Sequence, residues 1–486
     1  MIRWITRLLT KQKNISPRRS PLYLKNNLSG IKEVFIPFKL DMIRLYSCGP
    51  TVYGPAQIGN LRSFVFSDLI ARSVLALGYR VKRVINITDV GHLVGDADQG
   101  EDKMSVGAIR EKVSPKEISE RYTKLFLADL SELGIDVDSI EFPRATDYIR
   151  EQIALAKTLE EKGFAYLLSD GLYFDTQKFP TYGALGGLRD ASLLSGARVK
   201  QVSRKRHPSD FVLWRKAKPG DLQQWDSPWG RGNPGWHIEC SAMIRSLLGQ
   251  EIDIHTGGED LAHIHHNNEI AQSEAASGRT FVRYWMHNAF LTMDGEKASK
   301  SLGNVVYLSQ IKENGIPPLA LRYFFLQAHY STPLSFSWDA LRGAEGALER
   351  LWKTSREIAK ESARVHAPSE IQDRFLSEMR DDLSTPQALG ILWESLRNED
   401  YTPEEKWGLL EVAEAHFGLD LTNPPKENKL SENDIPIEVR TLLAKREEAR
   451  TKKDFAEADR IRNDILLMGY NIDDKSDGPV LFRVTA

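Results

Sequence analysis

Cysteine is scarce in this chain, and long apolar runs are missing. Only two of the 486 residues are cysteines, Cys48 and Cys240, and they lie far apart. A small secreted domain stapled by disulfides needs more cysteines in closer spacing, so this pair indicates a reducing compartment. No apolar stretch approaches the roughly 18 residues of a membrane span. We therefore expect no structural disulfide and no membrane contact.

An excess of either charge is also missing. The chain has 65 Lys and Arg residues against 67 Asp and Glu residues, which gives a net charge of −2. No global field attracts nucleic acid, so any RNA binding must come from local basic patches. The hydrophobic content of 41% and charged content of 27% are typical of a globular protein, and the length predicts two to four domains.

Acidic residues are absent before Glu33. Residues 1–20 hold six basic residues and an apolar group that could face one side of a short helix, which is the composition of an organelle transit peptide. The segment is short and poor in serine, so we favour a basic extension and a cytoplasmic protein. The basic residues are Arg3, Arg7, Lys11, Lys13, Arg18 and Arg19, and the apolar ones are Trp4, Ile5, Leu8 and Leu9.

The first part of the chain predicts a βαβ unit with parallel strands. A buried strand at Ile43–Tyr46 is followed by a helix from Gly59 to about Leu77 and by a strand at Arg80–Ile87. Ligands of such sheets bind at the carboxyl ends of the strands. Cys48 and Thr88 both fall at those ends.

Helices and strands alternate again later in the chain, after an irregular stretch at 171–229 that interrupts the pattern. We predict a helix at Asp147–Lys162, with Thr146 as its cap, before this stretch. After Gly303 the pattern becomes helical. The later elements are expected at Trp236–Leu247 (helix), Glu251–His255 (strand), Leu261–Ala275 (helix), Val282–His287 (strand), Ala340–Ile358, Arg374–Met379 and Gln387–Leu396 (helices), Glu438–Leu467 (one long helix or two) and Val480–Val484 (strand).

Cys48 opens the segment Cys48-Gly49-Pro50-Thr51-Val52-Tyr53, and Cys240 closes Gly235-Trp236-His237-Ile238-Glu239-Cys240. His265 and Glu269 are four positions apart, so they share one face of a helix. Together with Cys48 and Cys240 they offer two thiolates, one imidazole and one carboxylate, which form a suitable tetrahedral zinc site. The alternative is two inert buried cysteines and a solvated face of His and Glu. The neighbouring motifs favour zinc.

Two further motifs are suited to binding phosphate. Gln57-Ile58-Gly59-Asn60 precedes a helix, where a glycine lets a nucleotide approach the backbone and the helix N-terminus favours anions. Lys297-Ala298-Ser299-Lys300-Ser301-Leu302-Gly303-Asn304 places lysines and hydroxyls in one loop, where they can stabilise a polyphosphate transition state by charge. Taken singly, each has a plain alternative, a common glycine before a helix and a solvated basic loop.

In this order the motifs resemble those of class I aminoacyl-tRNA synthetases, and within that class the cysteinyl-tRNA synthetase family. The similarity runs from about residue 22 to the C-terminus. The segments that carry it, besides the two phosphate motifs, are Cys48-Gly49-Pro50-Thr51-Val52-Tyr53, Asn86-Ile87-Thr88-Asp89, Gly235–Met243, Asp253-Ile254-His255, His265–Ser273, Asp382–Ala388 and Lys453–Arg462.

The resemblance implies an α/β fold with a Rossmann-like parallel-sheet catalytic domain split by an insertion, followed by a helical-bundle domain and a small C-terminal tRNA-binding segment. It implies one Zn²⁺ per chain and ATP with Mg²⁺, L-cysteine and tRNA(Cys) as substrates. We expect a monomer. The expected parts are 1–20 (extension), 21–170 and 230–304 (catalytic halves), 171–229 (insertion), 305–340 (stem contact), 341–425 (helical bundle) and 426–486 (anticodon-binding segment).

The resemblance also assigns site residues. The zinc ligands are Cys48, Cys240, His265 and Glu269. The residues around the amino acid are Thr51, Thr88, Trp236, His255 and Asp260. For His266 two roles stay open, which are contact with the substrate and support of the metal site. ATP is bound by Gly59, Asn60, Ser299, Lys300 and Ser301, and the catalytic residues are Lys297, Lys300, Gln57 and Asn60.

Three departures from the family pattern bear on catalytic rate. Gln57 stands where the family has a histidine, and an amide cannot supply a positive charge to the ATP phosphates. Ala298 replaces a methionine, and Gly91–Asp96 replaces a more acidic continuation. Two rival functions stay open: a cysteine-activating ligase with an amino-sugar acceptor, and an RNA-binding protein without catalysis.

Overall fold

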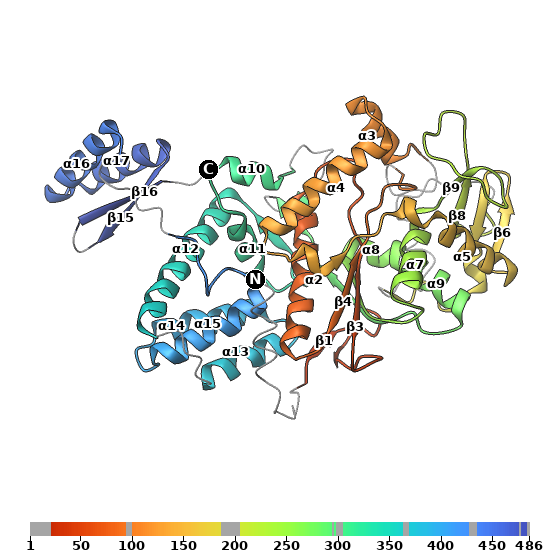
Figure 1. Cartoon of the computed structure of the whole chain (residues 1–486), viewed down its shortest axis with the longest axis horizontal. Coiled ribbons are helices and arrows are strands. Elements are labelled where there is room, and N and C mark those ends of the chain that lie inside the picture. The colour runs from red at the N-terminus through yellow and green to blue at the C-terminus, as the bar shows by residue number, and fades with distance from the viewer. Residues whose placement is uncertain are drawn as a thin grey trace.

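The computed structural model describes residues 21–93, 100–185, 205–293, 296–297, 305–362, 369–426, 435–475 and 478–483. At its centre lies a five-stranded sheet in the order β11-β10-β3-β4-β5, in which every neighbouring pair is parallel (Figure 1). This confirms the predicted α/β fold. The strands are β3 (Ile43–Ser47), β4 (Val81–Ile85), β5 (Ile140–Glu141), β10 (Ile252–Gly258) and β11 (Val282–Asn288).

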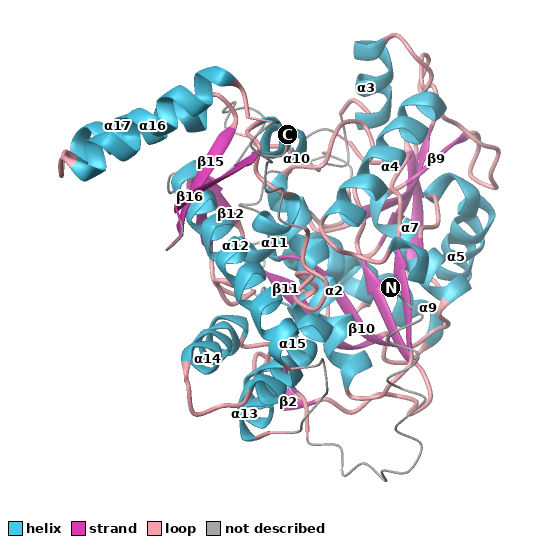
Figure 2. Ribbon diagram, turned by 60° about the vertical axis from the view of Figure 1, so that its left-hand side comes forward, coloured by secondary structure: helices cyan, strands magenta, loops and turns pink. Residues whose placement is uncertain are grey.

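Helix α2 (Ile58–Ala76) connects β3 to β4, as the sequence predicts. Its apolar residues are buried on most sides because the sheet lies on one side and helices α11 (Pro318–Leu326) and α15 (Pro403–Phe417) on the other. Gly78 ends the turn after the helix at a φ of 81°, a conformation that glycine adopts without strain. Figure 2 shows helices covering the sheet.

A buried carboxylate joins α2 to its neighbours. Asp68 accepts hydrogen bonds from Arg72 on the same helix (2.7 Å), from Arg83 on β4 (2.9 Å) and from Arg322 on α11 (2.7 Å). Arg322 also donates to the carbonyls of Leu133, just after α4 (Pro115–Glu132), and of Phe417, at the end of α15. The cluster therefore holds the parallel sheet against the helical part of the chain.

A second, antiparallel sheet in the order β6-β7-β8-β9 interrupts the parallel-sheet fold between residues 165 and 234. It begins before the expected insertion at 171 and ends after 229. The prediction that Thr146 caps the helix expected at Asp147–Lys162 is wrong. That helix, α5 (Ile149–Glu161), begins after Tyr148, and Thr146 instead donates to Asp89 (2.7 Å). The strands are β6 (Ala165–Leu168), β7 (Gly171–Phe174), β8 (Phe211–Lys216) and β9 (Gly232–Pro234), and the helices packed beside them are α5 (Ile149–Glu161), α7 (Trp236–Leu247) and α9 (Asn267–Ser277).

The helical part lies beside the sheet, and the C-terminal unit projects at the left of Figure 1. Its long helical stretch is two helices, α16 (Ile437–Thr451) and α17 (Phe455–Leu467), because Lys453 adopts a left-handed φ of 60° between them. The helices of the bundle are α12 (Trp338–Glu361), α13 (Glu370–Arg380), α14 (Thr385–Arg397) and α15. The C-terminal hairpin is β15 (Tyr470–Lys475) and β16 (Gly478–Arg483).

The shorter elements connect these parts. None of the described helices combines the length and apolar character needed to cross a bilayer. The remaining strands are β1 (Tyr23–Lys25), β2 (Lys32–Val34), β12 (Leu291–Met293), β13 (Glu296–Lys297) and β14 (Leu334–Phe336), and the remaining helices are α3 (Lys103–Glu111), α4 (Pro115–Glu132), α8 (Glu259–Leu261), a π-turn at Ala262–His266 and α10 (Leu308–Glu313).

Candidate active site

The site lies at the carboxyl edge of the parallel sheet, where the chain leaves β3 and β10. Cys48 follows β3, and its amide donates to the carbonyl of Thr256 on β10 (3.1 Å). Gly49 has no alternative here, because a Cβ atom on it would lie 1.5 Å from the carbonyl oxygen of Asn86. The glycine lets the chain turn tightly against the end of β4 and directs Cys48 across the sheet edge.

Four side chains meet there as the sequence predicts. One ligand atom each of Cys48, Cys240, His265 and Glu269 lies within 4.8 Å of every other. The sulfur atoms of the cysteines are 4.0 Å apart, and Nε2 of His265 is 2.9 Å from a carboxylate oxygen of Glu269. Cys240 comes from α7, and the other two from the π-turn and from α9. Soft sulfur donors with one imidazole and one carboxylate suit zinc.

Burial and mutual contacts shift the pKa values of these four side chains, and that of Cys48 is raised by burial, Cys240 and Glu269. Burial raises the pKa of Cys240, but hydrogen bonds to Cys48 and His265 outweigh this effect and lower that pKa to about 6. Burial lowers the pKa of His265, yet Glu269 and Cys240 raise it to about 10. Burial alone raises the pKa of Glu269, whereas His255 and His265 lower it to about 2. Two anionic donors are thus balanced by a proton on His265, which a metal ion would displace.

A layer of further histidines surrounds the four side chains, and sequence reasoning gave no role to two of them, His237 and His287. Nδ1 of His237 is 2.9 Å from Nδ1 of His265. His287 lies 2.7 Å from His266, whose other ring nitrogen is 3.3 Å from the sulfur of Cys48. His237 stands within the quoted motif Gly235–Met243, which was the available signal.

His255 and His266 also form a second donor set with Cys48 and Glu269, again with ligand atoms within 4.8 Å of one another. His255 is fully buried and its Nε2 lies 3.0 Å from Glu269. The set that contains both sulfur atoms matches the preference of zinc for thiolates better. At their positions, His255 and His266 can orient Glu269 and Cys48, as outer residues do at metal sites.

Of the residues expected to surround the amino acid, Trp236 packs on His265 and His255 contacts Glu269. Trp236 and Thr51 are half-buried, so part of each faces solvent. Thr51 pairs with Thr88 in an isolated parallel bridge, and Thr88 donates to Glu239 (3.0 Å). Glu239 is fully buried, and desolvation raises the pKa of its carboxyl well above the usual range; sequence reasoning did not single it out. Asp260 is exposed beside the end of β10.

The first phosphate motif forms the N-terminus of α2. The backbone N–H of Gln57 donates to the side-chain oxygen of Asn60 (3.2 Å), and Gly59 lies between these two residues in the chain. A Cβ atom on Gly59 would meet only Leu291, at an ordinary 3.7 Å. Internal packing therefore does not require this glycine, and its open backbone is suited to a nucleotide.

The second phosphate motif lies mostly outside the described residues. Ala298, Ser299, Lys300 and Ser301 are not described, and only the backbone of Lys297 is, at the end of β13. Where the chain resumes, Tyr307 pairs with Gln57, and Val306 accepts a hydrogen bond from Ile58 (3.0 Å). The exit of the loop is thus anchored against the first motif.

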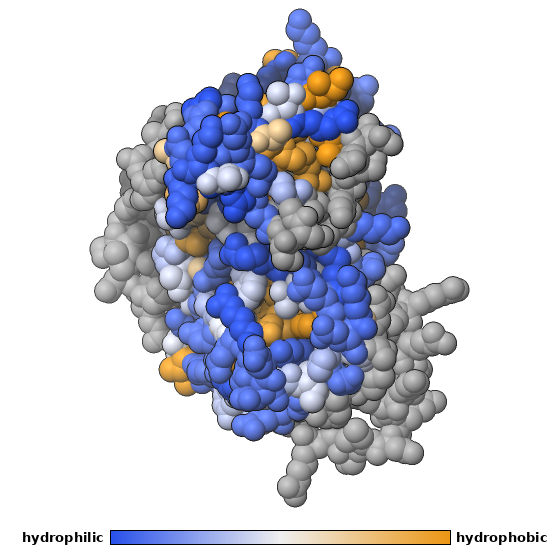
Figure 3. Space-filling model, turned by 90° about the vertical axis from the view of Figure 1, so that its left-hand side faces the viewer, coloured by the Kyte–Doolittle hydropathy of each residue, from blue (hydrophilic) through white to orange (hydrophobic). Residues whose placement is uncertain are grey.

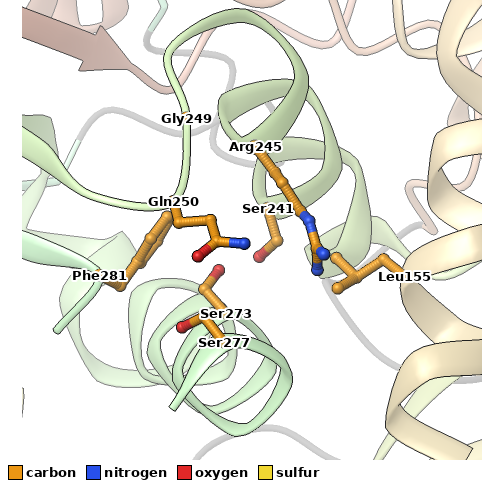
Figure 4. Close-up of a pocket in the computed structure, with 8 residues that line it drawn as sticks. All are labelled: Leu155, Ser241, Arg245, Gly249, Gln250, Ser273, Ser277 and Phe281. Carbon is orange, nitrogen blue, oxygen red and sulfur yellow. The ribbon is translucent and has the colours of Figure 1, made fainter. Parts of the chain in front are cut away.

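A separate small cavity lies behind the site, between α7 and α9 (Figure 4). Its volume is about 10 Å³, which is the room of a single water molecule. Hydroxyls of Ser241 and Ser273 point into it, with Arg245 and Gln250 at its edge. This cavity is too small for a substrate.

Comparison with known proteins agrees with this geometry. The family model for the class I (C) tRNA synthetase catalytic domain matches residues 34–346, and that for the cysteinyl-tRNA ligase anticodon binding domain matches residues 432–479. Cysteine--tRNA ligase 1 of Burkholderia lata is 44% identical over 95% of this chain and 97% of its own length. Cysteine--tRNA ligase of Chlorobaculum tepidum is 41% identical over 94% and 98%.

The fold has solved counterparts as well. Mycobacterium tuberculosis methionyl-tRNA synthetase, in complex with methionyl-adenylate, superposes with a TM-score of 0.55 at 15% identity, covering 79% of this chain and 90% of that one. At this identity the likeness concerns the fold alone. The full-length similarity to curated relatives is decisive, and the chain belongs to the cysteinyl-tRNA synthetase family of class I aminoacyl-tRNA synthetases.

Proposed function

We propose that the chain attaches L-cysteine to tRNA(Cys) through a cysteinyl-adenylate. An oxygen of the cysteine carboxylate attacks the α-phosphorus of ATP in line, and pyrophosphate leaves. A hydroxyl of the 3′-terminal ribose of the tRNA then takes the cysteinyl group, and AMP leaves. The observation that carries the proposal is the convergence of two cysteines, a histidine and a glutamate at the sheet edge beside a half-exposed tryptophan.

Cys48, Cys240, His265 and Glu269 would hold a zinc ion, which supplies a soft Lewis acid able to bind the thiolate of the substrate. Serine is nearly isosteric with cysteine, and a hydrophobic pocket alone cannot reject it strongly. Discrimination at the binding step removes the need for an editing site. The antiparallel sheet β6–β9 then needs no hydrolytic role.

The other residues bind and position. Gly59 and Asn60 would contact ATP at the start of α2, where the helix dipole favours phosphate. Lys297 and Lys300 would stabilise the pyrophosphate leaving group by charge, with Ser299 and Ser301 beside them. Such catalysis depends on positioning and electrostatics rather than on a covalent intermediate.

The C-terminal unit would bind the anticodon. Figure 3 shows this side of the molecule as largely hydrophilic, with apolar spots between. Arg440, Lys445 and Lys453 are exposed and suited to phosphate contacts. Arg446 has another role, because it is buried and donates to both carboxylate oxygens of Asp474 (2.8 and 2.7 Å).

The decisive experiment is ATP–pyrophosphate exchange with cysteine, with serine as the matched amino acid. Cysteine should support exchange and serine should not, and the purified protein should hold one zinc per chain. Charging of tRNA then separates this function from an amino-sugar ligase, which has no use for an anticodon-binding unit. Absence of cysteine-dependent exchange in zinc-loaded protein would refute the proposal.

A further inference from the structure

His92 contacts two residues, Trp236 and Thr51, that the family resemblance assigns to the surroundings of the amino acid. Its ring stacks on the indole of Trp236, with a centroid distance of 3.8 Å and an interplanar angle of 10°. Its Nδ1 lies 2.5 Å from the hydroxyl oxygen of Thr51. His92 itself is 6% exposed, whereas Trp236 and Thr51 are half-buried. The imidazole therefore contacts both residues from the buried side and supports them there.

Trp236 is held on both sides. Besides His92, its ring neighbours are His265, at a centroid distance of 4.4 Å and an angle of 39°, and His237, at 5.2 Å and 38°. The indole thus lies between His92 and a proposed zinc ligand. The contact with His92 is near-parallel and that with His265 is tilted, and a ring contact contributes a modest gain beyond burial. Removal of the His92 ring would free one face of the indole and let it turn away from the metal cluster.

Lys103 selects the tautomer of His92. Its Nζ lies 2.7 Å from Nε2 of the imidazole, and its backbone amide donates to the carbonyl of His92 (2.9 Å). A lysine ammonium has only donors, so Nε2 must accept and the ring proton must be on Nδ1. Nδ1–H then donates to the oxygen of Thr51. The hydroxyl proton of Thr51 is left for an acceptor elsewhere.

We propose that His92, fixed by Lys103, is a positioning residue of the amino-acid site. It holds the plane of Trp236 beside the metal cluster and orients Thr51 as a hydrogen-bond donor to a carboxylate or carbonyl oxygen of the bound amino acid. This inference rests on the proposed function. It assigns a task to His92, which lies in a stretch that departs from the family pattern.

Two substitutions separate the two contacts. His92→Phe keeps a flat ring against Trp236 but removes the donor to Thr51. His92→Asn places an amide donor near the position of Nδ1 but removes the ring. We expect each to raise the KM for cysteine by about three- to tenfold, because the free energy of one ordinary hydrogen bond or ring contact corresponds to a change of that size. The KM for ATP and the zinc content should stay unchanged.

Lys103→Met tests the tautomer without altering the ring. It should raise the KM for cysteine in the same direction as His92→Phe, and it carries the test if His92→Phe does not fold. His207→Phe is the matched control, because Nδ1 of His207 also lies 2.5 Å from a serine hydroxyl, Ser209, outside the site. That variant should keep the wild-type KM for both substrates.

The kinetic constants come from cysteine-dependent pyrophosphate exchange, with zinc content and thermal midpoint measured on each protein. An inactive wild-type protein would count against the proposed function and not against His92 alone. With an active wild type, an unchanged KM for cysteine in folded His92→Phe and His92→Asn would overturn the inference. An equal rise in the KM for ATP, or loss of zinc, would reduce His92 to a purely structural residue.

Discussion

Replacement of Asp68 should destabilise the junction of the sheet and the helical part more than any single arginine replacement in the same cluster. Asp68 is 1% exposed and accepts from three guanidinium groups, Arg72, Arg83 and Arg322. Although burial raises its pKa, these arginines hold that pKa far below the usual range of a carboxyl. Asp68→Asn keeps the shape of the side chain but removes the only charge that all three arginines contact.

The expected cost follows from the burial of the partners. Loss of one member of a buried ion pair typically costs about 3–5 kcal/mol, because the remaining charge stays uncompensated. Arg83→Met should cost less, since two of its guanidinium nitrogens, Nε and one terminal NH2, have no partner in the described part of the chain. The double variant Asp68→Asn/Arg83→Met should recover part of the loss, because it removes one of the unbalanced cations.

Hydrogen exchange of backbone amides in α2 and α11 is the appropriate assay, because a protein with several domains does not unfold in two states. A loss of 3–5 kcal/mol lowers amide protection by about two to more than three powers of ten. Wild-type protection should also fall in acid: a lowered carboxyl pKa stabilises the fold above the unfolded pKa, near 4, and the gain is lost as the pH falls through the folded pKa. Unchanged protection in Asp68→Asn, or no recovery in the double variant, would refute the reasoning.

Three further predictions concern the proposed function. Cys240→Ser should lose zinc and cysteine-dependent exchange while the fold is kept, and full activity of metal-free wild type would contradict it. A truncation that starts at Pro21 should keep exchange near wild type, because β1 begins at Tyr23, so a collapse of exchange in a folded truncation would place residues 1–20 in the catalytic domain. Gln57→His should raise the adenylation rate by roughly tenfold or less, since charged donors form stronger hydrogen bonds, and leave the preference for cysteine over serine unchanged; an activity below that of Gln57→Ala would show a pocket rebuilt around the amide.

Local patterns in the sequence predicted most of the fold and the inner donor set. The bounds of α7 agree with the prediction, and those of α2 and β11 differ by a residue or two, because apolar spacing and flanking glycines are local signals. The pairing of His265 with Glu269 also depends on local helical spacing. Thr146 failed as a cap because Asp89, far away in sequence, offered it a carboxylate.

The outer part of the site could not be predicted, since it depends on contacts between distant segments. The stack of His92 on Trp236 joins a residue that precedes the antiparallel sheet in the sequence to one that follows it, and no spacing rule relates them. His287 contacts His266 from β11, a strand that is buried along nearly its whole length and whose sequence gives no local signal for a histidine at the site. The π-turn at Ala262–His266 buries two consecutive histidines, which an ordinary helical pattern does not predict.

Two of these outer histidines, His287 and His266, form a chain of contacts that ends at the sulfur of Cys48. Burial lowers the pKa of His266, and it also lowers that of His287, to about 3, so both rings are neutral. Nδ1 of His287 has no partner among the described residues, whereas its Nε2 lies 2.7 Å from Nδ1 of His266. If His287 donates through Nε2, then Nδ1 of His266 accepts and its Nε2–H faces the sulfur of Cys48, 3.3 Å away. Burial, Cys240 and Glu269 raise the pKa of the Cys48 thiol, and a donor aimed at the sulfur opposes their effect by favouring the thiolate, which is the form that binds zinc.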